Sequence, residues 1–158
     1  LAHARAAASG VAPGARTPVA EVAEALARTL RRLHANRQID ISVDAAGDHA
    51  ARTERADLEE MLGNLMDNAC KWAAGRLSLS TRIDGTSLVC TVDDDGPGVD
   101  DDLRESVLQR GVRADETAPG SGFGLAIVRD LAEVYDGTVV LSRSPLGGLR
   151  ATLTLPAG

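Results

Sequence analysis

The sequence predicts an α/β fold, a two-layer α/β sandwich in which one mixed sheet of about five strands is covered on one face by three helices. Three observations lead to this prediction. Three segments repeat apolar residues with the period of a helix. Five shorter segments are apolar, or alternate apolar and polar residues, as strands do. The chain of 158 residues is also the usual size of one domain, and it can form a core without a metal or disulfide staple.

The first expected element is a helix that follows an irregular N-terminal stretch. Residues 1–16 are rich in Ala and interrupted by Gly and Pro, so we expect a linker or the end of a preceding helix there, and a domain that spans 17–158. Thr17 suits the cap of a helix, and Pro18 suits its first position. We expect this helix to end near Arg37.

The remaining elements follow from the same two periods. Two hairpin signals, Asp84-Gly85 and the 145–148 turn, separate pairs of strands. In chain order we expect a strand at 39–43, a helix at 56–73, strands at 77–83 and 88–92, a helix at 123–135 that stops at Gly137, and strands at 139–142 and 149–155.

Composition excludes several classes of function. The net charge of −6 excludes a general nucleic-acid binder, which would carry a basic face. No apolar run approaches the roughly 20 residues of a membrane span, so we expect no membrane contact by this chain. Cys70 and Cys90 lie in apolar patterns, which favours buried reduced thiols, with a single disulfide as the alternative. The chain begins at Leu1 rather than Met, so we expect it to be part of a longer protein.

The second helix carries a polar face beside its apolar stripe. Asn64, Asn68 and Lys71 are spaced by four and three residues, so they share one side of the helix. Amide oxygens are hard, neutral ligands for Mg²⁺, and a lysine one turn further on can contact phosphate. A solvated helix face is the alternative, but asparagine is a poor helix former and two of them need some compensation.

An acidic, glycine-rich segment follows the 88–92 strand. A carboxylate in the 93–95 run can accept a hydrogen bond from an exocyclic amine such as that of adenine, and it would repel a guanine carbonyl. Gly96 and Gly98 allow the backbone to approach a flat ligand closely. An acidic turn is the alternative; a calcium loop is disfavoured because the EF-hand spacing is missing.

A third glycine cluster, residues 120–125, opens the third helix. Exposed N–H groups at a helix start form a site for phosphate. The cluster is neither a dinucleotide fingerprint, because no strand precedes it, nor a P-loop, because no Gly-Lys-Ser/Thr follows it. The 100–122 stretch shows no secondary-structure period, and we expect a flexible lid in which Arg110 and Arg113 close over phosphate.

In order and spacing, these three sites resemble the N box (64–72), G1 box (94–98) and G2 box (120–125) of the histidine-kinase catalytic domain. This domain belongs to a wider ATPase group with gyrase, the 90-kDa heat-shock chaperones and the MutL repair proteins. The resemblance covers 17–155, and the amino-acid sequence of 63–71 is similar to that of the PhoQ sensor kinases of Gram-negative bacteria. It implies a Bergerat-type ATP-binding fold with ATP and Mg²⁺ as cofactors.

The resemblance also implies a role for each matching residue. Asn68 and Asn64 would hold Mg²⁺, and with Lys71 they are the implied catalytic residues. Lys71 and Arg110 would contact phosphates, Trp72 would flank the nucleotide, and Asp94 would accept from the adenine amine. The full set implied to bind nucleotide is Asn64, Asn68, Lys71, Trp72, Asp94, Gly96, Gly98, Arg110, Gly120, Ser121, Gly122, Phe123, Gly124 and Leu125.

Three positions depart from related patterns. No Phe precedes Arg110, where an F box is expected, and Ser121 stands where PhoQ-like lids carry Gln. Asn64 stands where the gyrase and chaperone branches place a Glu that activates water. An amide has no useful basicity, so we expect slow hydrolysis and a phosphoryl acceptor supplied from outside this domain.

The acceptor is not expected within this chain. His3, His34 and His49 lack the sequence setting of a phosphoacceptor and are expected to be surface histidines. The resemblance implies an acceptor histidine on an upstream dimerisation domain, a response regulator reached through that domain, a homodimeric parent and a cytoplasmic position below a bacterial inner-membrane sensor. The isolated chain would bind ATP without autophosphorylation. An anti-sigma serine kinase and a degenerate module that only docks partners are the alternatives.

Overall fold

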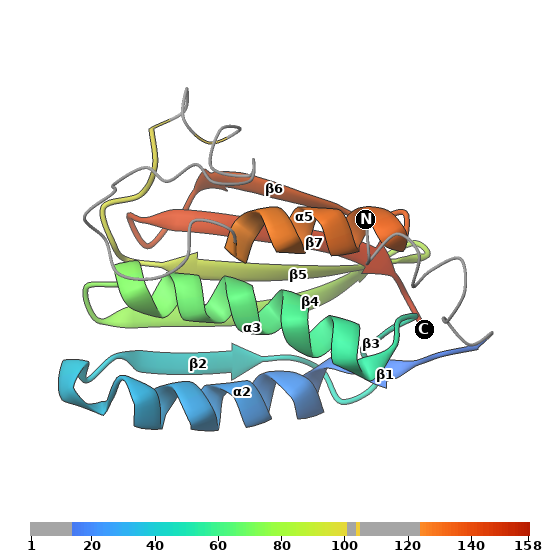
Figure 1. Ribbon diagram of the computed structural model, residues 1–158, viewed down its shortest axis with the longest axis horizontal. Helices are drawn as coiled ribbons and strands as arrows, with labels where there is room; N and C mark the ends of the chain where they lie inside the picture. Colours follow the sequence, from blue (N-terminus) through green and yellow to red (C-terminus); the bar gives the residue numbers. More distant parts are fainter. Residues whose placement is uncertain (1–13, 101–103, 105–123) are drawn as a thin grey trace.

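The computed structural model describes residues 14–100, 104 and 124–158 (Figure 1). The elements in chain order are β1 (Thr17–Pro18), α2 (Val19–Leu33), the 3₁₀ turn η1 (Ala35–Arg37), β2 (Asp40–Asp44), β3 (Ala50–Ala51), α3 (Arg55–Trp72), β4 (Arg76–Asp84), β5 (Ser87–Asp94), α5 (Gly124–Val134), β6 (Thr138–Arg143) and β7 (Leu149–Pro156).

Five of the described strands form a mixed sheet with the described helices on a single side. The order across the five-stranded sheet is β2-β4-β5-β7-β6. β2 pairs with β4 in parallel, and the other neighbours are antiparallel. The helices α2, α3 and α5 lie on one face of this sheet (Figure 1). The predicted two-layer α/β sandwich with a mixed sheet and three helices is therefore confirmed.

The core lies between the helices and the sheet face that they cover. In β7 buried and half-buried residues alternate strictly, which points every second side chain toward the helices. Leu58, Leu62 and Leu65 of α3 are buried in the same cluster as Leu88 of β5 and Leu153 of β7. Fully burying each such side chain contributes roughly 1.5–3 kcal/mol. This packing fixes the position of α3 over the centre of the sheet.

The N-terminal boundary differs from the prediction. Thr17 does not cap α2, because its hydroxyl donates to the Thr53 carbonyl at 2.9 Å and Thr17–Pro18 pair with Ala50–Ala51 as a small second sheet. Such a short strand has no period that a sequence pattern could reveal. α2 ends at Leu33 rather than near Arg37, where the chain instead forms a 3₁₀ turn.

Several smaller expectations were tested by the same structure. Cys70 and Cys90 are buried and unbonded to each other, as favoured; burial raises the pKa of Cys70 to about 11 and that of Cys90 to about 12. His34 and His49 are half-buried, and each ring lies within 3.5 Å of a polar side-chain oxygen. Within the described ranges, no helix has the length and apolarity to cross a membrane.

Candidate functional site

The candidate residues gather at one end of the sheet. The C-terminal end of α3, the C-terminal end of β5 and the N-terminal end of α5 all lie on that side (Figure 1). Asn64, Asn68, Lys71 and Trp72 belong to α3, and Asp94 is the last residue of β5. Three separate segments of the sequence therefore meet around one region.

The asparagine face of α3 lies against the start of α5. The Asn64 amide nitrogen donates to the Glu60 carbonyl at 2.8 Å, which fixes the orientation of the amide. A Cβ built on Gly124 would lie 3.2 Å from Asn64 Oδ1, so this oxygen faces the first residue of α5. Asn68, one turn further along α3, is half-buried. Both amides thus lie on the side of α3 that borders the third predicted site.

Lys71 is engaged in an ion pair that the sequence pattern did not reveal. Its ammonium lies 3.0 Å from Asp67 Oδ2, one turn back along α3. The other Asp67 oxygen lies 3.5 Å from His34 Nε2. Partly exposed pairs with this spacing contribute only about 0.3–0.5 kcal/mol, so an anionic ligand can compete for Lys71.

Asp94 is a buried carboxylate that has no cation beside it among the described residues. It is 2% exposed, and its Oδ1 accepts from the backbone N–H groups of Gly96 at 2.9 Å and Leu149 at 3.2 Å. Within the described part of the chain, nothing donates to its Oδ2. Burial raises the pKa of Asp94 above its ordinary value, although the two N–H donors act in the opposite direction. One oxygen is therefore anchored by two backbone N–H groups, and the other has no donor among the described residues.

The neighbouring aspartates have different partners. Asp93 is 6% exposed and forms a two-bond pair with Arg150, at 2.8 and 3.1 Å. Asp95 Oδ1 accepts from the N–H groups of Ala74, Gly75 and Arg76. Asp93 and Asp95 are thus structural, and Asp94 is the member of this run that is buried without a charged partner among the described residues.

Glycines keep the backbone around Asp94 tightly packed. A Cβ on Gly96 would lie 2.3 Å from the Trp72 carbonyl oxygen, and one on Gly148 would lie 2.1 Å from Asp94 Oδ1. Gly98 has a φ of 77°, in the region that favours glycine. Gly96 and Gly98, which the sequence predicted as site residues, therefore have a steric reason to be glycine. Gly148 was not predicted, and its only signal was its place in a turn.

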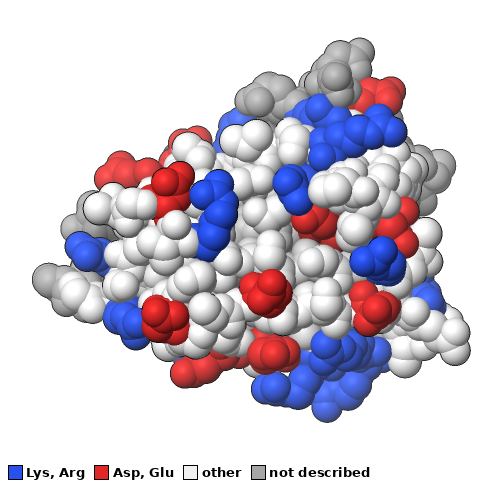
Figure 2. Space-filling model, turned by 180° about the vertical axis from the view of Figure 1, so that it is seen from behind, with Lys and Arg blue, Asp and Glu red and all other residues white. Residues whose placement is uncertain are grey.

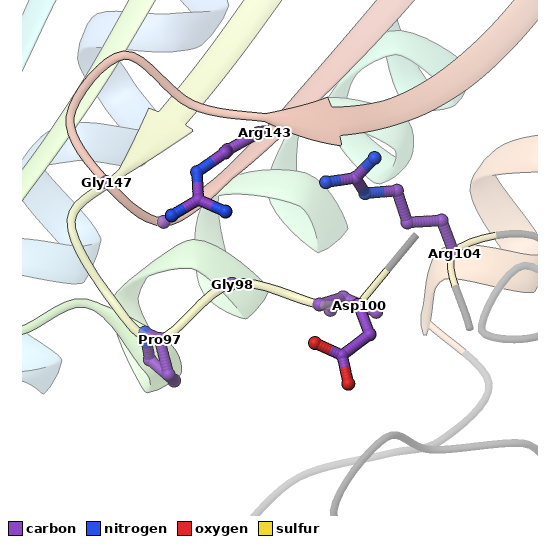
Figure 3. A pocket seen from close by; sticks show the side chains of 8 residues that line it. Pro97, Gly98, Asp100, Arg104, Arg143 and Gly147 are labelled. Carbon is purple, nitrogen blue, oxygen red and sulfur yellow. The ribbon is translucent and has the colours of Figure 1, made fainter. Parts of the chain in front are cut away.

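A pocket of about 200 Å³ lies beside this loop (Figure 3). Its walls are the 97–100 segment, Arg104, Arg143 and the turn at Gly147 and Gly148. The guanidinium groups of Arg104 and Arg143 both extend toward the pocket (Figure 3). The backbone after Asp94 is therefore tightly packed at Gly96 and borders a pocket from Pro97 onward.

Some predicted residues fall outside the described part. These are Arg110, Gly120, Ser121, Gly122 and Phe123, together with most of the 100–122 stretch. Gly124 and Leu125 are described and form the start of α5. The structure therefore brings Asn64 to Gly124, and Trp72 to Gly96, and the outer part of the predicted site remains a prediction.

The donor set around α3 fits a magnesium ion that also binds phosphate. Among the described residues, no group of three or more His, Cys, Asp or Glu side chains could hold a metal ion by itself. Mg²⁺ usually keeps several waters and takes few protein ligands together with phosphate oxygens. Asn64 and Asn68 offer neutral amide oxygens on one side of α3, which matches the small number of protein ligands that a phosphate-bound Mg²⁺ takes.

The face of the sheet opposite the helices has a different character. Lys and Arg side chains are interspersed there with Asp and Glu (Figure 2). Its charges therefore alternate in sign and do not form a single basic surface of the kind that binds nucleic acid.

Comparison with curated proteins gives close relatives. The chain is 45% identical over 144 residues to the sensor protein kinase CarS of Pseudomonas aeruginosa, which covers 91% of this chain and 32% of that protein. It is 37% identical over 133 residues to the sensor protein PhoQ of Escherichia coli K12, which covers 84% of this chain and 27% of that protein. The chain thus spans about a third or less of the length of these relatives.

Solved structures show the same architecture. The mycobacterial sensor histidine kinase MprB superposes with a TM-score of 0.77 at 26% identity, covering 90% of this chain and 97% of that one. The catalytic domain of the histidine kinase ThkA superposes with a TM-score of 0.82 at 17% identity, covering 92% and 96% of the two chains, which shows a shared fold.

A family match covers the three sites. Residues 53–158 match the family described as histidine kinase-, DNA gyrase B- and HSP90-like ATPase. This range contains α3 with its asparagines, the Asp94 loop and the start of α5. The chain belongs to the histidine kinase-, DNA gyrase B- and HSP90-like ATPase family.

Proposed function

We propose that this chain is the Mg-ATP-binding catalytic domain of a two-component sensor histidine kinase. The observation that carries the proposal is the buried Asp94 carboxylate, which has one oxygen anchored by backbone N–H groups while the other has no donor among the described residues. The similarity to sensor kinases over most of the chain supports the histidine-kinase branch of the family.

The nucleotide binds with its adenine at Asp94 and its phosphates along α3. The open oxygen of Asp94 accepts from the adenine amine, and a carboxylate in this place repels the carbonyl of guanine. Lys71 and the N–H groups at the start of α5 contact phosphate, and Trp72 flanks the nucleotide. Asn68, with Asn64, holds Mg²⁺, which neutralises charge on the phosphates when bound.

The domain transfers the γ-phosphoryl group to an external histidine. Asn64 cannot remove a proton from water, so this face favours transfer over hydrolysis. In the proposal, the acceptor histidine lies on a dimerisation domain upstream of residues 17–158, and a response regulator receives the group from it. Residues 100–122, with Arg110 and the 120–123 glycine segment, form a lid over the phosphates. The parent is a homodimeric sensor with this domain on the cytoplasmic side of the inner membrane.

Calorimetric titration of the chain with ATP, GTP and ATP in excess EDTA tests this proposal. We expect ATP with Mg²⁺ to bind, with GTP at least about tenfold weaker because the Asp94 carboxylate meets an acceptor. Removing Mg²⁺ is expected to weaken ATP binding. Equal affinity for ATP and GTP, or no binding, would contradict the proposal. Incubation with γ-labelled ATP is expected to leave the isolated chain unlabelled and to give an acid-labile phosphohistidine in the parent protein.

A further inference from the structure

The turn that follows α3 joins the two halves of the proposed nucleotide site. Lys71 and Trp72 occupy the last turn of α3, and residues 73–76 then lead into β4. Gly96, two residues after Asp94, packs directly on the Trp72 carbonyl. The position of this turn therefore sets the distance between the phosphate side, on α3, and the adenine side, at Asp94.

Arg37 binds this turn from the side of η1. Its Nη1 donates to the carbonyls of Cys70 at 2.7 Å and Lys71 at 3.1 Å, and its Nη2 donates to the carbonyl of Ala73 at 2.6 Å. These are carbonyls that a helix leaves without partners at its C-terminal end. A positive charge is also favourable there, because the helix dipole places negative charge at that end.

Asp95 binds the same turn from the other side. Its Oδ1 accepts from the N–H groups of Ala74 at 2.8 Å, Gly75 at 3.0 Å and Arg76 at 3.0 Å. Burial alone would raise the pKa of this carboxyl, but these N–H groups hold it below its ordinary value. Arg37 thus holds carbonyls and Asp95 holds N–H groups of one continuous seven-residue segment, 70–76.

We propose that Arg37 and Asp95 are positioning residues that fix the 70–76 segment and thereby set the spacing between the phosphate-binding and adenine-binding halves of the site. Neither side chain needs to touch the nucleotide. The inference rests on the proposed function, since it concerns how that site binds ATP. It adds two residues that lie outside the predicted set.

A spacing role has a consequence that a purely structural role lacks. ATP must contact Asp94 and the α3 face at once, whereas adenosine needs only the Asp94 half. If the segment loses its fixed position, the binding of ATP should therefore weaken more than the binding of adenosine. Small errors in the position of binding groups can cost up to about a hundredfold in function. The chain also contains a single tryptophan, Trp72, inside the segment, so its fluorescence reports the local geometry directly.

The experiment measures the affinities of Mg-ATP and adenosine for wild type, Arg37→Ala, Asp95→Asn and the double variant, well below each melting temperature. We expect each single variant to bind ATP on the order of tenfold more weakly and adenosine less than about threefold more weakly. The double variant should lose less than the product of the single losses, because both side chains hold one segment. The Trp72 emission of the unliganded variants should shift.

Arg82→Ala and Asp84→Asn serve as matched controls, because this exposed pair on β4 is 3.6 Å apart and lies outside the site. Arg37→Lys keeps the positive charge but lacks the planar guanidinium that donates to several carbonyls, so it should lose part of the ATP affinity. This variant takes the place of Arg37→Ala in the test if Arg37→Ala does not fold. Folded variants with wild-type ATP affinity, or with equal losses for ATP and adenosine, would overturn this inference alone. A wild-type chain that binds neither ligand would overturn the proposed function together with it.

Discussion

Asp93, Asp94 and Asp95 show how strongly environment separates chemically identical side chains. Asp93 is neutralised by Arg150, and Asp95 is satisfied by three backbone N–H groups. Among the described residues, Asp94 is the buried member that has no cation beside it and no donor to its Oδ2. A buried, ionised carboxylate is costly unless it is paired. In the proposed function, a ligand that donates to Asp94 offsets this cost.

Replacing Asp94 by Asn should separate stability from binding. Because the pKa of Asp94 is raised in the folded state, this group stabilises the wild-type fold at pH values below its ordinary pKa of 3.8. That stabilisation is lost as the pH rises through the folded-state pKa. At neutral pH the ionised group destabilises the fold, so we expect Asp94→Asn to melt at a higher temperature. ATP affinity should fall by at least about a hundredfold, because an amide nitrogen would face the adenine amine.

Asp93→Asn is the adjacent control for this prediction. It breaks the pair with Arg150, so it should lower the melting temperature and leave ATP affinity near the wild-type value. The stability gain of Asp94→Asn should also disappear below about pH 3.8, where the wild-type carboxyl is protonated. Unchanged ATP binding in Asp94→Asn would show that the adenine site lies elsewhere.

The helices α3 and α5 are joined at the end away from the site. The Tyr135 hydroxyl, just after α5, donates to Asp57 near the start of α3 and accepts from the Glu54 N–H at 3.3 Å. Burial and the Asp57 carboxylate raise the pKa of Tyr135. This connection helps to fix the angle between the two helices, and thereby the approach of Gly124, at the start of α5, to Asn64 in the middle of α3.

Tyr135→Phe tests the strength of that connection. Losing one hydrogen bond to a charged group and leaving Asp57 without this partner should lower the free energy of unfolding by about 1.5–3 kcal/mol. Urea denaturation measures the change. Asp48, in an exposed loop, offers a contrast, and Asp48→Asn should change the free energy of unfolding by less than about 0.5 kcal/mol. A Tyr135→Phe variant as stable as wild type would contradict this role.

The periodic helices and strands were predictable, and contacts made by irregular segments were not. The stripes of α2 and α3 and the alternation of β7 predicted their elements to within a few residues. The two-residue strands β1 and β3 were missed, because Thr17 reads equally well as a helix cap and its real partner, Thr53, is distant in sequence.

The same limit applies to the site. Asn64, Asn68 and Asp94 stand in local patterns that point to their chemistry. Arg37 carries no such pattern, because its role depends on carbonyls more than thirty residues away that only the folded chain brings near. In the sequence, Asp95 is one member of an acidic run. Its role as an acceptor for backbone N–H groups could not be separated from the role of Asp94, because only the folded chain shows that the turn at 73–76 lies beside it.

The described part of the chain forms a scaffold that carries the proposed site at one end. The sheet and three helices bury a continuous core, and the segments that carry chemistry all leave that core at the same end (Figure 1). In the proposed function, α3 supplies the groups that bind the metal ion and the phosphates, and β5 supplies the carboxylate that accepts from the adenine amine. The fold thus brings together, on rigid elements, two half-sites that are 26 residues apart between Asn68 and Asp94.

A crystal structure of the chain with Mg²⁺ and a nonhydrolysable ATP analogue tests this account most directly. We predict the adenine amine within hydrogen-bond distance of Asp94 Oδ2, and Mg²⁺ about 2.0–2.1 Å from Asn68 Oδ1 with its remaining ligands from phosphate and water. A nucleotide bound with its base away from Asp94, or a metal ion that does not contact the α3 asparagines, would contradict it.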